Sequence, residues 1–310
     1  MFLEIFNIVA PVFVLVIVGY AFVKIGWVTA SVIDGLMRFG VLIAIPCLLF
    51  RATYSLDLNT AFEWRPLVAY YSGAISCFIF AIVIFRFGFK KRPGESVGIA
   101  FSALFSNLVM LGVPISERAW GAELMMPNFA LIAVNAPICY LIGITVMEFT
   151  RADGRNGRDT AIIVVQAMFK NSLMIGIGLG LMVNISGFQV PEPLYAPIEL
   201  LAQSAIPVAL FGLGGVLTRY STGVVSREAS VVTVLALIIH PVIALLACWS
   251  FGLSEDVVRS IVLMAAMAPG LNAYLFTTMY KRGESIAASA VILSTTLSVL
   301  TLSLWLIFLR

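Results

Sequence analysis

The stretch SNLVMLGVPISERAW, residues 106–120, lies where the hydropathy of the sequence predicts a membrane-spanning helix. It nevertheless places an asparagine, a glycine and a proline close together, at Asn107, Gly112 and Pro114. Proline removes a backbone N–H and clashes with the carbonyl one turn earlier, which costs about 3 kcal/mol inside a helix. In hydrocarbon the freed carbonyls would also lack water, so this interruption decides which folds the chain can adopt.

The composition is that of a membrane protein. Of the 310 residues, 61% are hydrophobic and 11% are charged, whereas about a quarter of the residues of a soluble domain are charged. The first segment lacks the basic start and small-residue cleavage site of a signal peptide, so we interpret it as the first helix. The net charge of +3 does not indicate nucleic acid binding, because the basic residues lie in short loops. We expect an all-α membrane protein without a soluble domain.

The four cysteines do not predict a metal site or a disulfide framework. Cys47, Cys77, Cys139 and Cys248 all lie in apolar segments, without CxxC or Cys/His spacing. They are expected to be packing residues.

A spanning helix needs about 20 apolar residues, and ten segments meet that requirement. Their approximate limits are 3–23, 33–50, 66–87, 95–116, 124–148, 171–186, 195–217, 230–251, 257–280 and 286–309. Of the 19 Lys and Arg residues, the loops on the side of the termini hold only Arg51, Arg65, Arg118, Arg259 and Arg310. The other side is therefore predicted to be cytoplasmic. We expect a multi-pass protein of the cell inner membrane with both termini outside, in the periplasm.

The sequence contains an internal repeat. The motif IPxxLF occurs at residues 45–50 and again at 206–211, and the same offset of 161 residues carries Gly19 onto Gly180. A smaller offset of 155 residues carries Pro114 onto Pro269. We predict a first repeat over residues 1–149, a cytoplasmic linker over 150–160 and a second repeat over 161–310. Because each repeat has five spans, the second is inverted, as in secondary transporters.

The ninth predicted span is interrupted like the fourth. It reads VLMAAMAPGLNAYLFTTMY, residues 262–280, with Pro269, Gly270 and Asn272 near its middle. Non-helical backbone at membrane depth is tolerated where it is buried in protein or lines a cavity. Matched Gly and Pro interruptions in two halves therefore predict a substrate site at the membrane midplane.

These segments resemble a known family. GVP in FSNLVMLGVPIS, and MAAMAPGLNAYLF with the following TMYKRG, resemble the two crossover helices of the auxin efflux carrier family. That family includes plant PIN-type auxin exporters and bacterial malonate or malate carriers. The segment VAPVFVLVIVGYAFVKIGWV is similar to its first helix, and the resemblance covers nearly the whole chain.

The resemblance implies a fold and a set of site residues. The fold has ten helices in two inverted five-helix repeats, whose fourth and ninth spans cross at their proline breaks, usually in a homodimer; it is similar to that of the sodium/bile-acid symporters. The crossover residues map by position onto Asn107, Gly112, Pro114, Pro269, Gly270 and Asn272. The linker is short here, so regulation through a long loop is not expected.

A mechanism follows from the breaks. A half-helix that begins at a break presents free N–H groups and the positive end of its dipole, which suits a carboxylate. We therefore expect a secondary transporter that binds a small organic anion between the breaks and works by alternating access. The crossover domain would move against a support formed by spans one, two, six and seven.

Four further residues have two interpretations each. Asn135 either lines the site or makes an interhelical hydrogen bond in packing. Pro46 and Pro207 either line the site from the support or have a purely structural role. His240, the only histidine, either relays protons or is a hydrogen-bonded packing residue.

Several alternatives stay open. The middles of the spans contain no Asp or Glu, which weakens the case for proton coupling. Two other modes of transport are open. One is coupling to sodium held by carbonyls and asparagines, as in a sodium-coupled carrier of the bile-acid symporter type, and the other is uniport. A channel is disfavoured because neither a charged ring nor a repeated filter sequence is present. No catalytic motif, metal site or cofactor is expected. Malonate, malate and auxin-like indoles are all compatible substrates, and the direction of transport is open.

Overall fold

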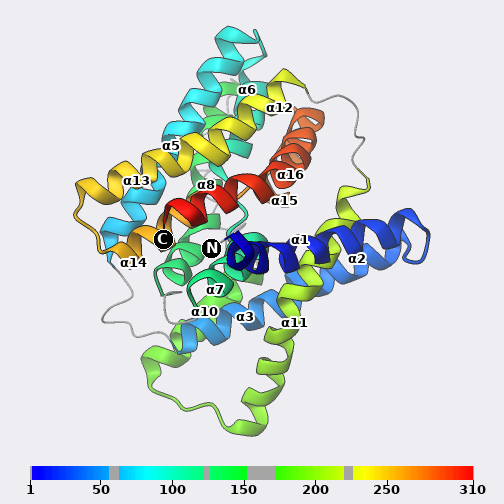
Figure 1. Ribbon diagram of the computed structural model, residues 1–310, viewed down its shortest axis with the longest axis vertical. Helices are drawn as coiled ribbons and strands as arrows, with labels where there is room; N and C mark the ends of the chain where they lie inside the picture. The colour runs from blue at the N-terminus through cyan, green and yellow to red at the C-terminus, as the bar shows by residue number, and fades with distance from the viewer. Residues whose placement is uncertain (1, 56–62, 122–125, 152–171, 220–225, 310) are drawn as a thin grey trace. The chain divides into compact units, whose positions relative to one another are not determined.

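The computed structural model describes residues 2–55, 63–121, 126–151, 172–219 and 226–309. This part of the chain consists of α-helices and short π-helical segments without a β-strand (Figure 1). The predicted all-α class is therefore confirmed. Most of the linker predicted at 150–160 lies outside the described residues.

The chain forms two compact units, which we describe separately. Unit 2 comprises residues 11–62 and 162–219, and unit 1 the remainder. The helices of unit 2 are α1 (Phe2–Lys24) from Pro11 on, α2 (Ala30–Phe39), η1 (Gly40–Ala44), α3 (Ile45–Tyr54), α10 (Ser172–Ser186) and α11 (Glu192–Leu217). These elements correspond to predicted spans one, two, six and seven, the group expected to form the support.

Unit 1 contains the elements of the other six predicted spans. In the first half of the chain they are α5 (Trp64–Val83), η2 (Ile84–Gly88), α6 (Pro93–Leu104), η3 (Leu108–Gly112), α7 (Val113–Trp120) and α8 (Met126–Arg151). In the second half they are α12 (Arg227–Val234), η5 (Leu235–Ile239), α13 (His240–Ser250), α14 (Glu255–Ala265), α15 (Leu271–Tyr280) and α16 (Glu284–Phe308). Helices α5 and α13 pack side by side. Each unit thus takes helices from both predicted repeats.

Six helical stretches in the described residues are long and apolar enough to cross a membrane. They are Ala30–Tyr54, Trp64–Gly88, Asn128–Thr150, Glu192–Leu217, Arg227–Ser250 and Glu284–Phe308, and Ala10–Lys24 and Ile175–Ser186 are shorter apolar helices. Predicted spans four and nine are each divided into separate helices. The total of ten spans stays a prediction.

Three π-helical segments precede prolines near the start of a following α-helix. The segment η1 leads into Ile45-Pro46, η3 into Val113-Pro114 and η5 into His240-Pro241. Proline has no N–H and clashes with the carbonyl four residues earlier. The wider π-turn is one of the local adjustments that accommodate proline at membrane depth. Pro207 differs, because it lies inside α11 without such a segment.

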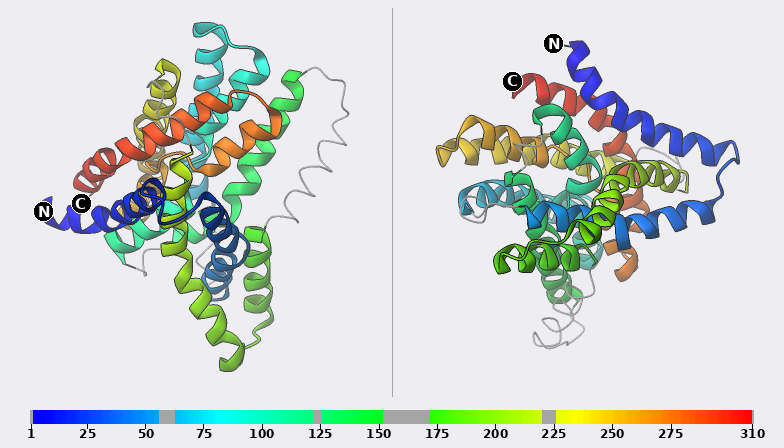
Figure 2. Two further views of the ribbon diagram at one scale, coloured as in Figure 1. Left: turned by 90° about the vertical axis from the view of Figure 1, so that its right-hand side faces the viewer. Right: turned by 90° about the horizontal axis from the view of Figure 1, so that it is seen from below.

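Helix α16 is arranged for a bilayer. It buries the polar residues Ser294, Thr295 and Ser298 and exposes Leu300 and Leu304. The serine hydroxyls donate to carbonyls of their own helix, Ser294 to that of Ala290 and Ser298 to that of Thr295. Leucines that face outward are well solvated by lipid, whereas small and polar residues allow helices to approach closely. Figure 2 shows this helix, in orange to red, in two further directions.

Glycines bring the helices of unit 2 into backbone contact. A Cβ at Gly214 of α11 would overlap the carbonyl oxygen of Val16 in α1. A Cβ at Gly176 of α10 would overlap the backbone of Pro46 in α3. Backbones that approach this closely gain van der Waals contacts, the main attraction between helices in lipid.

We expect Gly214→Ala to lower the free energy of unfolding by about 1–3 kcal/mol, because the added methyl meets rigid backbone. Gly178→Ala in α10 is the matched control, because a Cβ there meets no atom within 4 Å. Thermal unfolding of the purified variants in detergent measures both. Equal unfolding temperatures would contradict the close packing of α1 and α11.

Candidate functional site

The first break lies between α6 and η3. Helix α6 ends at Leu104, and Asn107 is the N-cap of the helical stretch that η3 and α7 form together. The side-chain Oδ1 of Asn107 accepts a hydrogen bond of 3.2 Å from the backbone N–H of Met110. Asparagine is a favoured N-cap because its side chain satisfies one of the first backbone N–H groups of a helix. Asn107 therefore starts the half-helix after the break.

The second break lies between α14 and α15. Helix α14 ends at Ala265, and α15 begins at Leu271 with Gly270 as its N-cap in an extended conformation. Pro269 and Gly270 are both buried. Proline cannot continue the helix hydrogen bonds of α14, so the chain leaves the helix before it.

The two breaks meet within unit 1. Ser106 and Pro269 form an isolated antiparallel bridge, and the N–H of Asn107 donates to the carbonyl oxygen of Ala268 at 2.9 Å. Pro269 has no N–H to contribute to the bridge. A Cβ at Gly270 would lie 3.1 Å from both Cβ and Cγ of Asn107, so a larger residue there would require Asn107 to shift. The structure thus brings Asn107, Pro269 and Gly270 together.

The expectation that the fourth span breaks at its proline is wrong. Pro114 is the second residue of α7, and the chain is already helical from Leu108. Proline is compatible with a helix start, and the preceding π-turn accommodates it here. Gly112 lies one turn after the break, where its N–H donates to the carbonyl oxygen of Asn107 at 3.1 Å, and a Cβ there would lie 2.6 Å from Sδ of Met264 in α14. Both residues are buried and support the half-helix after the break.

Asn272 lies at the second position of α15, two residues from Gly270. It is half-buried, and within the described part of the chain its side-chain amide makes no hydrogen bond. The amide is therefore available to a ligand, in contrast to Oδ1 of Asn107.

Asn135 of α8 is buried in a polar contact between helices. Its Oδ1 accepts a hydrogen bond of 3.4 Å from the hydroxyl of Tyr71 in α5 and a contact of 3.5 Å from Sγ of Cys139. These partners favour the packing interpretation over a role in lining the site.

His240 is also enclosed by packing. Its ring is fully buried, its Nε2 lies 3.3 Å from the carbonyl oxygen of Tyr70, and it meets the Tyr70 ring edge-on at 4.8 Å. A Cβ at Gly73 would lie 2.6 Å from the imidazole, so this glycine makes room for the histidine. These contacts favour the packing interpretation.

Pro46 and Pro207 belong to unit 2. Pro46 is half-buried beneath Gly176, and Pro207 is exposed on α11. The contact of Pro46 with Gly176 favours a structural role for Pro46, and the role of Pro207 stays a prediction.

Sequence reasoning missed three serines. Ser106 forms the bridge to Pro269, and the hydroxyls of Ser102 in α6 and Ser116 in α7 are buried with no hydrogen-bond partner among the described residues. Serine is common in membrane helices, so none of them stands out in the sequence without knowledge of the bridge.

Comparison with known proteins now gives the family. Residues 4–306 match the family described as membrane transport protein. The chain belongs to this family. The resemblance to the auxin efflux carriers is thereby confirmed, and the protein is a multi-pass membrane transporter rather than an enzyme.

The relatives match over almost their whole length. A protein of Rhizobium meliloti named "Putative malonate transporter" is 22% identical over 303 residues, which cover 97% of this chain and 94% of the relative. An uncharacterised transporter of Methanothermobacter thermautotrophicus is 26% identical over 304 residues, 96% of each chain. A third, from Methanocaldococcus jannaschii, is 23% identical over 319 residues, 96% of this chain and 97% of the relative.

We expect Asn107→Ala to lower the free energy of unfolding by about 1 kcal/mol, because the N-cap of η3 is lost. Asn107→Ser should retain part of this stability, since serine can also cap. Asn272→Ala is the matched control and should unfold like the wild type. Thermal unfolding in detergent distinguishes them, and a wild-type unfolding temperature in Asn107→Ala would rule out the cap.

Proposed function

We propose that this family member is a secondary transporter that carries a small organic anion, with the substrate bound at the meeting of the two breaks in unit 1. The observation that carries the proposal is the hydrogen bond from Asn107 to Ala268, because it joins the starts of two half-helices. The first N–H groups of a helix have no partner in the helix and lie at the positive end of its dipole. Two such ends at one crossing favour a negatively charged ligand.

The chemistry of the crossing fits a carboxylate. The residues at the breaks are uncharged. The N–H groups of Leu108 and Met110 already donate to Ser106 and Asn107, so the proposed donors are the amide of Asn272 and the first backbone N–H groups of α15. They can bind a carboxylate without the desolvation cost of a buried lysine or arginine. One relative carries a name that refers to malonate, which makes malonate and similar small carboxylates the first substrates to test.

Packing in unit 2 supports the predicted inverted repeat. A shift of 161 residues carries Gly19 onto Gly180 and Phe50 onto Phe211. A Cβ at Gly19 would overlap the carbonyl oxygen of Phe211, and a Cβ at Gly180 would lie 2.6 Å from that of Phe50. The shift of 161 residues relates each of these two contacts to the other, as a two-fold relation between the halves requires.

A second pair of contacts in unit 2 behaves in the same way. Gly214 approaches the carbonyl oxygen of Val16, and the hydroxyl of Thr53 donates to the carbonyl oxygen of Ile177 at 3.3 Å. The same shift of 161 residues carries Val16 onto Ile177 and Thr53 onto Gly214.

The crossing in unit 1 follows the same shift. It carries Asn107 onto Ala268, and these two residues are hydrogen-bonded to each other. Equivalent residues that contact one another lie on a two-fold axis. We therefore propose that the axis of the repeat passes near the proposed binding site. On this proposal the offset of 161 residues, rather than the offset of 155 between Pro114 and Pro269, relates equivalent positions at the crossing.

The two compact units suggest how access alternates. Unit 1 carries the proposed site, and unit 2 contains the helices expected to form the support. Alternating access in transporters with inverted repeats is largely a rigid-body movement of one bundle against the other. We propose that unit 1 moves with its bound anion while unit 2 stays fixed, in a homodimer of the inner membrane.

The transport prediction uses Asn272. We expect Asn272→Ala to reduce the rate of malonate counterflow at least about tenfold, because a hydrogen bond to a charged ligand contributes about 1.5–3 kcal/mol. Its unfolding temperature should be unchanged, which separates binding from folding. Counterflow in proteoliposomes measures the rate, with Asn135→Ala as a packing control whose main effect should be on stability. Undiminished transport in Asn272→Ala would contradict the assignment of the binding site to the crossing.

The topology prediction uses a matched pair of exposed serines. Ser254 precedes α14 and is predicted to lie on the side of the termini, and Ser285 lies at the start of α16, which is predicted to be on the opposite side. We expect a membrane-impermeant maleimide to label Ser254→Cys in intact cells and Ser285→Cys only after permeabilisation. The native chain is the control, because Cys77, Cys139 and Cys248 are buried and Cys47 is half-buried. The reverse pattern would invert the predicted orientation.

A further inference from the structure

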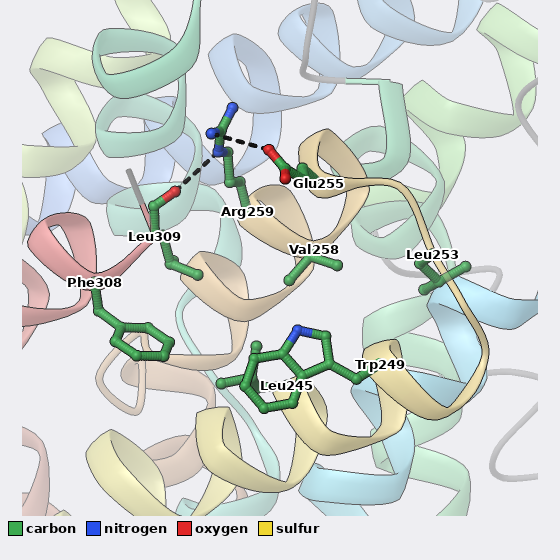
Figure 3. Close-up of a pocket in the computed structure, with 8 residues that line it drawn as sticks. All are labelled: Leu245, Trp249, Leu253, Glu255, Val258, Arg259, Phe308 and Leu309. Carbon is green, nitrogen blue, oxygen red and sulfur yellow. Dashed lines mark hydrogen bonds and ion pairs between the residues drawn. The ribbon is translucent and has the colours of Figure 1, made fainter.

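A pocket of about 290 Å³ lies in unit 1 at the ends of α13 and α16 and the start of α14. Figure 3 shows its lining residues, in which apolar side chains lie below and charged ones above. Leu245, Val258 and Leu309 are buried at the pocket, whereas the rings of Trp249 and Phe308 are more than half exposed. The pocket therefore has an apolar floor and two aromatic walls.

The rim carries charges of both signs. The Nε of Arg259 donates to the carbonyl oxygen of Leu309 at 2.8 Å, which holds the guanidinium at the end of α16. Its two Nη atoms lie 3.3 Å from Asp256 and 3.5 Å from Glu255. The side chains of Glu255 and Asp256 are 89% and 56% exposed. Among the described residues, one guanidinium thus stands beside two accessible carboxylates.

The position of the pocket points to the bilayer interface. Arg227–Ser250 and Glu284–Phe308 are both long and apolar enough to span, and the pocket is lined by their last turns. Aromatic rings at the ends of spans occupy the headgroup level of a membrane. An occupant of this pocket is therefore expected to have an apolar part in the bilayer and a charged part at the rim.

We propose that this pocket binds the headgroup of phosphatidylethanolamine, with the phosphate beside Arg259 and the primary ammonium beside Glu255 and Asp256. The glycerol and the upper acyl chain lie against Trp249 and Phe308. A headgroup of both charges matches a rim of both charges. Phosphatidylglycerol has no cation for the carboxylates, and the ammonium of phosphatidylcholine has no N–H to donate.

Native mass spectrometry of the delipidated full chain in mild detergent tests the proposal. Phosphatidylethanolamine, phosphatidylcholine and phosphatidylglycerol with identical acyl chains are added separately. The wild type should bind phosphatidylethanolamine more tightly than the other two. Equal affinity for the ethanolamine and choline lipids would overturn the proposal, since it would indicate an unspecific lipid shell or binding of any amphiphile.

The variant Glu255→Gln tests the role of the rim. We expect its affinity for phosphatidylethanolamine to fall up to about fivefold, as for the loss of an exposed ion pair. Its affinity for phosphatidylglycerol should rise, because Arg259 then faces one carboxylate fewer. The side chain of Glu255 is almost fully exposed, so the fold should be kept.

The matched control is Glu284→Gln, which removes a carboxylate at the other end of α16 and should leave all three affinities unchanged. An unchanged preference for phosphatidylethanolamine in Glu255→Gln would overturn the proposed headgroup contacts.

Discussion

The structure of unit 1 depends on one constraint: a helix broken inside a membrane must find partners for its freed peptide groups. Here the two breaks supply a hydrogen-bond partner to each other. The N–H of Asn107 is satisfied by the carbonyl of Ala268, and the Asn107 side chain satisfies the N–H of Met110. A break in only one of the two helices would leave the N–H of Asn107 or the carbonyl of Ala268 without this partner, at a cost of several kcal/mol. The two interruptions therefore belong together, and the close approach they need explains the glycine at Gly270.

The rest of the packing follows from the absence of a hydrophobic driving force between helices in lipid. Contact then depends on how closely backbones approach. Gly214 lets α11 reach the backbone of α1, and Gly73 makes room for His240 between α5 and α13. Helix α16 follows the same principle, because the small polar residues Ser294 and Ser298 are buried while Leu300 and Leu304 face outward. A glycine or a serine in these helices is thus as informative about the interior as a leucine is in a soluble protein.

The sequence predicted the helical class and an interruption in each of spans four and nine, because apolar length, proline and glycine are local signals. It also predicted the group of helices that forms unit 2, although this rested on the resemblance. The position of the first break could not be predicted in the same way. Pro114 is the most visible helix breaker in its segment, but a π-turn absorbs it, and the chain leaves the helix before Ser106. The role of Ser106 is set by the distant Pro269, and no local pattern records that contact.

The symmetry proposed for the crossing bears on the direction of transport. If Asn107 and Ala268 are equivalent and bonded to each other, both half-helices begin near the axis of the repeat. Their side chains differ, because the same shift pairs the proposed donor Asn272 with the apolar Leu111. A single site near the axis can be opened to either face of the membrane in turn. The uncharged donors also avoid the desolvation cost of a buried arginine, which its attraction to a carboxylate need not offset. Such a carrier has no built-in direction, and net flux through it is set by the gradients of the anion and of any coupled ion.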